Sequence, residues 1–127
     1  MNNKLELMRK WSARAKNPIY KRCTAEFTSK RKKNCFCIQG LLLETIREDF
    51  GRGEWVDHNT FALTPDFYIQ SLVDSFTYSL LCEKLGLDYD YADYRLIANM
   101  IELNDMKGYS LPQCADLIDA HFGLGEL

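Results

Sequence analysis

Apolar side chains recur at intervals of three and four residues through most of this 127-residue chain, and that spacing follows one face of an α-helix. In the first such stretch, Leu5, Met8 and Trp11 form a narrow apolar stripe with basic residues on both sides. Stretches of this kind predict five helices, at about 4–16, 36–50, 66–85, 91–105 and 111–121. A chain patterned in this way is expected to fold mainly as helices packed on one another.

Capping residues define the ends of several of these helices. Thr64-Pro65-Asp66 offers a capping hydroxyl, a proline at the first helical position and an acid that suits the positive helix end. It therefore predicts the start of the helix at 66–85, which we expect to form the centre of the core. Ser110 and Gln113 have the spacing of a capping box at the start of the last helix.

A small β element is expected between the second and third helices. Glu54-Trp55-Val56 and Phe61-Ala62-Leu63 flank the turn-forming residues Asp57-His58-Asn59-Thr60, which is the pattern of a β-hairpin or of two extended arms. Residues 23–28 are compatible with a short strand, although a loop is the preferred interpretation. Gly40 inside the second helix costs helix propensity, which indicates that another backbone packs close to it.

Length and composition limit the possible fold classes. The chain has the size of one domain and, with 46% hydrophobic residues, it can bury a full core. Its longest apolar run is Leu41-Leu42-Leu43, whereas a membrane-spanning helix needs about 20 residues. The N-terminus lacks the apolar stretch of a secretory signal. We therefore expect one cytoplasmic domain over residues 1–127, mainly α with about five helices and a small β-hairpin. Its segment 1–34 packs on, or extends from, a helical core at 35–127.

Charge is divided unevenly along the chain, although the formal net charge is only −2. Residues 1–34 hold eleven basic and two acidic side chains, and residues 35–127 hold five basic and sixteen acidic ones. Such asymmetry is typical of a protein that meets a nucleic acid or a membrane surface. An uneven division of charge is equally expected when a basic part of a fold packs against an acidic part of the same fold. The sequence leaves both explanations open.

The residues do not form a pattern typical of a catalytic or metal-binding site. The five cysteines are an odd count, and Cys35, Cys37, His58 and His121 lack the paired spacing of zinc ligands. Small buried thiols are the preferred interpretation. The chain carries no glycine-rich phosphate-binding motif. Residues 91–122 predict a helical hairpin rather than a helix-turn-helix, because no further helix follows to enter a DNA groove. We therefore expect a non-enzymatic protein without metal or cofactor.

Two clusters are candidate partner-binding sites. The first is the basic run Lys30, Arg31, Lys32 and Lys33, which is expected to be solvated. The second is the acidic segment in which Tyr89, Tyr91 and Tyr94 alternate with aspartates. The three tyrosines cannot all face a core, and an outward tyrosine among polar residues is favoured at protein interfaces. The alternative is a tyrosine packed on a neighbouring helix with its hydroxyl in water.

Short motifs scattered over residues 11–122 carry a family resemblance. They are Cys37-Ile38-Gln39-Gly40-Leu41-Leu42, Gly53-Glu54-Trp55-Val56, Leu103-Asn104-Asp105, Gly108-Tyr109-Ser110 and Ala115-Asp116-Leu117-Ile118. Together they resemble a family of small proteins of tailed phages and prophages that has no known activity. The chain departs from the family pattern at Leu43, near the family's second cysteine, and at Cys114, where the family has an aliphatic residue. The resemblance implies a phage origin and no catalytic residues.

The expected function is that of a small phage accessory protein that binds and modulates a host protein in the host cytoplasm, without catalysis. The alternative is a small nucleic-acid-binding protein that uses residues 9–33, where clustered cations could contact phosphates. In that case Tyr20 or Phe27 could stack on an unpaired base. No membrane partner is expected, and the sequence does not predict the oligomeric state.

Overall fold

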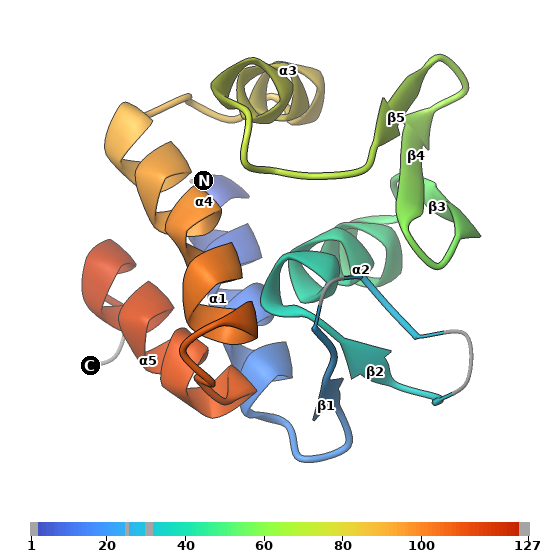
Figure 1. Ribbon diagram of the computed structural model, residues 1–127. Coiled ribbons are helices and arrows are strands. Elements are labelled where there is room, and N and C mark those ends of the chain that lie inside the picture. Colours follow the sequence, from blue (N-terminus) through green and yellow to red (C-terminus); the bar gives the residue numbers. More distant parts are fainter. Residues whose placement is uncertain (1–2, 25, 30–31, 125–127) are drawn as a thin grey trace.

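Helices dominate the part of the chain that the structure describes, residues 3–24, 26–29 and 32–124 of a computed structural model (Figure 1). The helices there are α1 (Asn3–Lys16), α2 (Ile38–Phe50), α3 (Ser75–Leu85), α4 (Tyr91–Asp105) and α5 (Leu111–Phe122). The strands are β1 (Lys21–Arg22), β2 (Cys35–Phe36), β3 (Glu54–Asp57), β4 (Thr60–Thr64) and β5 (Phe67–Ile69). The predicted fold class, one mainly α domain with a small β element, is confirmed, and the two small sheets mean that the chain is not wholly helical.

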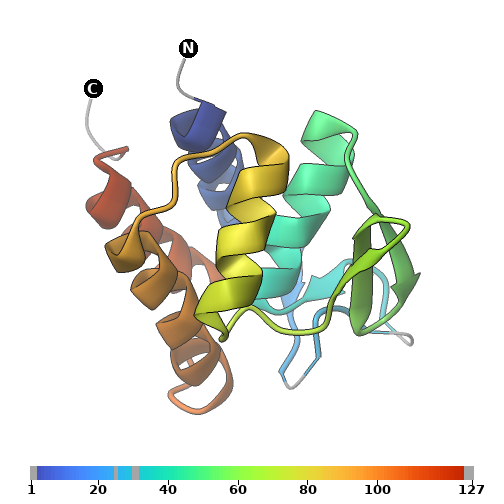
Figure 2. The same cartoon turned by 90° about the horizontal axis from the view of Figure 1, so that it is seen from above.

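Helix α2 is the most buried element, and the other helices and the sheets surround it (Figure 2). Every side chain from Ile38 to Ile46 is buried. Helix α1 packs against α2 and α5, and α4 packs against the same two helices. Helix α3 packs on α4 and contributes three buried side chains to the core, Tyr78, Leu81 and Cys82. The prediction that the helix at 66–85 forms the centre of the core was therefore wrong, because α2 occupies that place.

The start of α2 explains the glycine inside it. Cys37 caps the helix, and its Sγ accepts a hydrogen bond from the Gly40 amide at 3.2 Å. The Cys37 amide donates to the carbonyl of Phe27 at 3.0 Å, so the loop before β2 lies directly on the first turn. A Cβ at position 40 would collide with the backbone of Phe27. The close backbone approach predicted from Gly40 is confirmed.

The predicted helix at 66–85 begins nine residues later than expected. Thr64-Pro65-Asp66 forms the turn between β4 and β5, in which Thr64 Oγ1 donates to Asp66 Oδ1 at 3.0 Å. Asp74 is the residue that caps α3, through its bond from the Thr77 amide. The apolar residues Phe67 and Ile69 fit a strand as well as a helix, and pairing of β5 with β4 decides between them.

The predicted hairpin is present, and a third strand extends it. Strands β3 and β4 pair antiparallel with Trp55 opposite Phe61, and β5 pairs with the other edge of β4. The rings of Trp55 and Phe61 meet edge to face at 5.0 Å. Trp55 Nε1 donates to Glu44 on α2 at 2.9 Å, and this bond anchors the sheet to the central helix. Such support is needed because an isolated hairpin is marginally stable.

Strands β1 and β2 form a second, two-residue parallel ladder, with Lys21 opposite Cys35. The described residues between 23 and 28 are irregular except for a single bridge from Thr28 to Phe36. A loop is therefore the correct interpretation of that segment.

Asn104, at the end of α4, binds two segments that are distant in the sequence. Its Oδ1 accepts from the Ile38 amide at 3.2 Å, and its Nδ2 donates to the Cys23 carbonyl at 2.9 Å. Its own carbonyl accepts from Arg22. Asn104 has no exposed surface, so its side chain satisfies backbone groups that water cannot reach.

No helix among the described residues is both long and apolar enough to cross a bilayer.

Candidate protein-binding surface

A buried carboxylate holds the N-terminal part of the basic helix α1. Lys4 Nζ lies 2.7 Å from Oδ2 of Asp93, and His121 Nε2 lies 2.7 Å from Oδ1 of the same carboxylate. Asp93 is 4% exposed, so it joins α1, α4 and α5 inside the protein. Burial lowers the pKa of Lys4, but the hydrogen bond and the charge of Asp93 raise it more, and the net shift is upward.

The C-terminal half of α1 is paired in the same way. Lys16 binds Asp119 of α5, whose other oxygen accepts from Ser12 Oγ at 2.5 Å. Burial raises the pKa of Asp119, but the bonds from Lys16 and Ser12 lower it more, so it lies below its usual value. Arg14 lies 2.8 Å from Asp49 of α2. Much of the basic charge of α1 is therefore used to attach this helix to the acidic remainder.

Trp11 lies between these ion pairs and has no exposed surface. Its Nε1 donates to the carbonyl of Ile38 at 2.9 Å. We call this set of contacts the α1 seam; its members on α1 are Lys4, Trp11, Ser12, Arg14 and Lys16.

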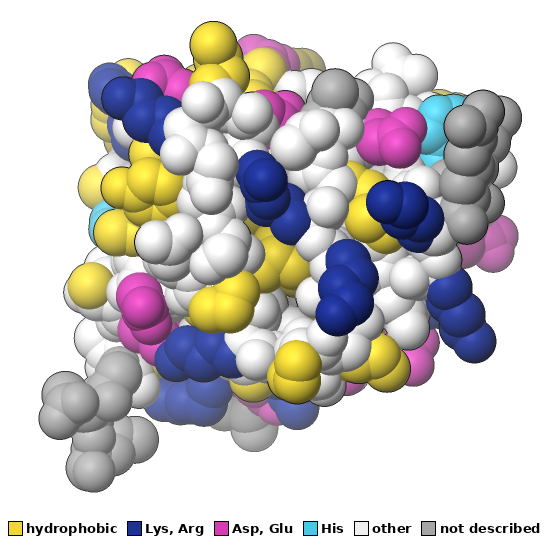
Figure 3. Space-filling model, turned by 60° about the horizontal axis from the view of Figure 1, so that its bottom comes forward, with side chains coloured by type: hydrophobic (Ala, Val, Ile, Leu, Met, Phe, Trp, Pro, Cys, Tyr) yellow, Lys and Arg dark blue, Asp and Glu magenta, His cyan; other side chains and the backbone are white. Residues whose placement is uncertain are grey.

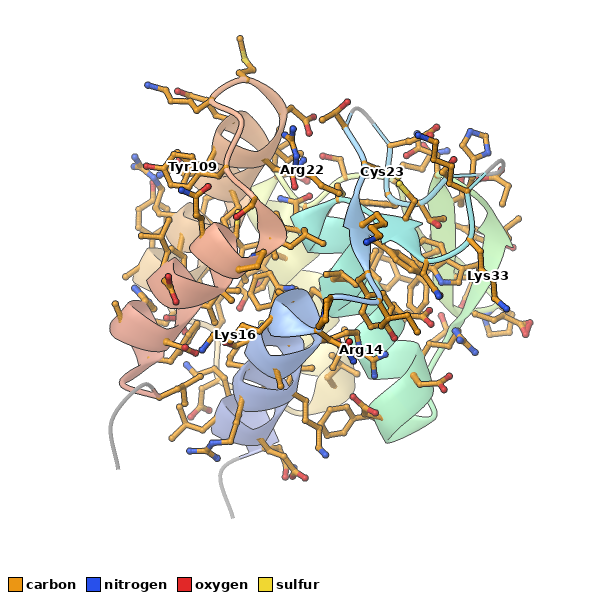
Figure 4. All side chains as sticks on the ribbon, turned by 90° about the horizontal axis from the view of Figure 1, so that it is seen from below. Arg14, Lys16, Arg22, Cys23, Lys33 and Tyr109 are labelled. Carbon is orange, nitrogen blue, oxygen red and sulfur yellow. The ribbon has the colours of Figure 1, made fainter. Side chains whose placement is uncertain are left out.

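Other cations stay at the surface, on the face seen in Figures 3 and 4. Lys21, Arg22 and Lys33 are exposed. Pairing of Lys21 with Cys35 places β1 beside the segment that carries Lys33, whereas Arg22 is directed to the end of α4 and lies apart from Lys33 (Figure 4). We call these three residues the basic face. Lys32, which was predicted to be solvated, is also exposed. Lys30 and Arg31 of the same predicted run lie outside the described residues.

The predicted tyrosine segment lies where the start of α4 meets the start of α3. Tyr94 Oη donates to the carbonyl of Val73 at 2.7 Å, and the hydroxyls of Tyr89 and Ser75 lie 2.8 Å apart. The Tyr91 and Tyr94 rings have their centroids 5.6 Å apart. These contacts place the three tyrosines in one group.

Four large side chains of this junction are directed outward. Phe76 is 69% exposed, Tyr91 57%, Val73 47% and Tyr89 40%. Val73, Tyr89, Tyr91 and the half-buried Tyr94 are linked by the contacts above, and Phe76 follows Ser75 in the first turn of α3. We call these five residues at the junction of α3 and α4 the tyrosine face. Sequence reasoning found its tyrosines but did not single out Val73 and Phe76, which lie within the predicted helix at 66–85. In the structure Val73 precedes α3, and the buried side of α3 carries Tyr78, Leu81 and Cys82, which leaves Phe76 exposed.

Lys32 and Lys33, the described cations of the predicted basic run, lie away from the tyrosine face. The described part of the segment before β2 is beside β2 and β3, whereas the connection from α3 to α4 is at the start of α4 (Figures 1 and 2). Neither of these two lysines pairs with a described carboxylate of the tyrosine segment. The cation that reaches the acidic tyrosine segment is Lys4 of α1, through Asp93.

The thiols are buried and carry no disulfide among the described residues. Burial raises the pKa of Cys37 to about 12 and that of Cys114 to about 11, so both are protonated at neutral pH. A protonated, enclosed thiol is a poor nucleophile. Within residues 3–24, 26–29 and 32–124, no three His, Cys, Asp or Glu side chains are grouped so that they could hold a metal ion.

A cavity of about 380 Å³ lies between the start of α1 and the ends of α2 and α3. Two of its polar side chains are already bound within the fold: Asp49 pairs with Arg14, and Arg52 donates to the Lys84 carbonyl at 3.1 Å. The tyrosine face therefore remains the stronger candidate site.

Comparison of the chain with protein-family models, with curated proteins and with solved structures finds no match.

Proposed function

We propose that this chain is a small accessory protein of the phage type that binds a host protein through the tyrosine face and has no catalytic role. The observation that carries the proposal is the exposure of Phe76, Tyr91, Val73 and Tyr89, all at the junction of α3 and α4. Aromatic side chains are enriched at protein interfaces and contribute most of the energy where they become buried. The resemblance of the sequence motifs to phage proteins supports the host setting.

The anchoring of the face also suits binding. The bonds from Tyr94 to Val73 and between Tyr89 and Ser75 hold two tyrosines and the start of α3 in place. A surface that is ordered before it binds loses little conformational entropy on association. The exposed rings are therefore ready to pack against a partner without rearrangement of the chain.

The test is affinity capture from a bacterial lysate with a matched pair of double variants. Phe76→Ser with Tyr91→Ser removes the two most exposed rings of the face. Val56→Ser with Tyr68→Ser removes two side chains that are 57% and 55% exposed but lie on the β3–β4–β5 sheet. We expect a stoichiometric partner that the first variant loses and the second retains. Equal capture by both variants, or no stoichiometric partner at all, would refute the proposal.

A second candidate is binding of nucleic acid through the basic face. It is favoured by the exposure of Lys21, Arg22 and Lys33 on one face, and by the half-buried Tyr20 and Tyr109 (Figure 4). It has less support, because the cations of the α1 seam are already paired with carboxylates. Gel-shift titration at low salt with mixed-sequence DNA and RNA tests it, since cationic contacts are strongest there. Absence of a shifted band under those conditions would eliminate this candidate.

A further inference from the structure

The tyrosine face lies among acidic side chains. The segment 73–95 holds five acidic and two basic residues. Asp74, Asp88 and Asp90 are exposed, one or two positions along the chain from Val73, Tyr89 and Tyr91. The exposed rings and the exposed carboxylates therefore share one part of the surface.

Two of these carboxylates keep an oxygen that the helix caps do not use. Asp74 accepts from Thr77 through Oδ2, and Asp90 accepts from the Ala92 amide through Oδ1. Each cap uses one carboxylate oxygen of its aspartate. The second oxygen of each residue can accept a hydrogen bond from a cationic partner.

The chain itself shows that this region attracts cations. The guanidinium of Arg95 lies over the Tyr91 ring, 5.9 Å from its centroid. Lys4 pairs with Asp93, and the charges of Asp90 and Asp88 also act on its ammonium group. Both a ring and a carboxylate of this region thus already hold a cation of the same molecule.

From this geometry we infer that the occupant of the tyrosine face is an arginine-rich or lysine-rich segment of the partner protein. The inference rests on the proposed function and adds the chemistry of the partner. A guanidinium stacks on the faces of Tyr89 and Tyr91, where cation–π attraction is available. The carboxylates of Asp88 and Asp90 accept its N–H groups.

The same features argue against other occupants. A nucleic acid brings phosphates, which the three exposed aspartates repel. An acidic peptide is excluded on the same ground. A second copy of this chain is the remaining occupant, and sedimentation of the protein alone distinguishes it from a cationic partner segment.

The test uses variants that remove charge but keep the fold. Asn caps helices as well as Asp, so Asp74→Asn with Asp88→Asn and Asp90→Asn leaves the caps of α3 and α4 in place. The matched control is Glu54→Gln with Glu102→Gln and Asp116→Asn. It changes the net charge equally, and its three residues are exposed away from the face.

The probe is a short fluorescein-labelled peptide of alternating arginine and glycine, with a glutamate–glycine peptide as its counterpart. Anisotropy measures affinity, and amide chemical shifts locate the site. We expect binding of the arginine peptide only, with shifts at Ser75, Tyr89 and Tyr91. The asparagine variant is expected to bind about tenfold more weakly, while the control stays near wild type. No binding, shifts that map elsewhere, or equal loss in both variants would overturn the inference.

Two outcomes separate this inference from the proposed function. If the captured partner is lost with Phe76→Ser and Tyr91→Ser but retained by the asparagine variant, the protein-binding function stands and the cationic partner is rejected. If sedimentation of the protein alone reveals self-association that the asparagine variant abolishes, the occupant is a second copy, and the inference is likewise rejected.

Discussion

The α1 seam and the tyrosine face differ in what the fold places opposite them. In the α1 seam, Lys4, Arg14 and Lys16 each meet a carboxylate from a distant part of the chain, and Trp11 is fully enclosed. In the tyrosine face, aromatic rings and carboxylates lie side by side, and the rings are directed to solvent. A cluster of charged or aromatic residues in the sequence therefore indicates an interaction, and that interaction can be with another part of the same chain.

This difference follows from the position of each region in the fold. Helix α1 lies between α2 and α5, so both of its flanks have neighbours (Figure 1). The first turn of α3 lies at the junction with α4, and its Phe76 is exposed. Substitutions in the α1 seam are therefore expected to affect stability more than similar substitutions in the tyrosine face.

The largest difference is expected between two aromatic truncations. Trp11→Ala empties a fully buried site and removes the bond to Ile38, which should lower the free energy of unfolding by about 3–5 kcal/mol. Phe76→Ala removes a ring that is mostly in solvent and should change it by less than about 0.5 kcal/mol. Urea unfolding followed by circular dichroism measures both. Similar losses of unfolding free energy for the two variants would show that the α1 seam is not more important for stability than the tyrosine face.

A smaller difference is expected between two aspartates of one segment. Asp93→Asn leaves Lys4 and His121 without their shared charge and should cost about 2 kcal/mol, less than a fully buried pair because both partners are partly exposed. Asp88→Asn changes an exposed residue and should cost less than about 0.5 kcal/mol. Thermal unfolding of the two variants at the same pH compares them. An Asp93→Asn protein as stable as wild type would show that this carboxylate does not anchor α1.

The smallest effect is expected at the outer ion pair of the seam. Asp119→Asn keeps an acceptor for Ser12 but loses the charge that faces Lys16, a loss of about 0.5–1 kcal/mol at neutral pH because solvent screens the pair. The pKa of Asp119 is lower in the folded protein than its usual 3.8. Its contribution is therefore complete above that value and is lost as the pH falls through the folded-state pKa.

Unfolding of wild type and Asp119→Asn at neutral and at acid pH tests the sign of this effect. We expect the difference in stability between the two proteins to shrink as the medium becomes more acid. A difference that grows on acidification would show that the carboxylate is not stabilised by Lys16.

Much of the helical structure could be predicted from local pattern. The expected helices at 4–16, 91–105 and 111–121 agree with α1, α4 and α5 to within a residue at each end. Their ends are set by short-range chemistry, such as the capping box of Ser110 and Gln113, which needs no distant neighbour. The prediction of a helix at 66–85 was wrong at its start, because Phe67–Ile69 pair with β4 in a hairpin and this pairing outweighed the helix start signal at Thr64.

Among the residues that carry the resemblance to phage proteins, those with clear contacts have structural roles. Gly40 admits the backbone of Phe27, Trp55 anchors the sheet through Glu44, and Asn104 satisfies buried backbone groups. Sequence patterns of this kind report on packing of the fold. They leave the candidate binding residues, which lie outside them, to be identified from the structure.

The sequence by itself determined the mainly helical class, most helix ends, the hairpin and the close contact at Gly40, because each depends on periodicity, caps or steric limits within a few residues. The tertiary structure alone decided that α2 forms the centre, that α1 uses its cations on Asp93, Asp119 and Asp49, and that Phe76 faces solvent. These outcomes depend on contacts between residues that are tens of positions apart in the chain. The spacing of residues within one segment does not predict such contacts.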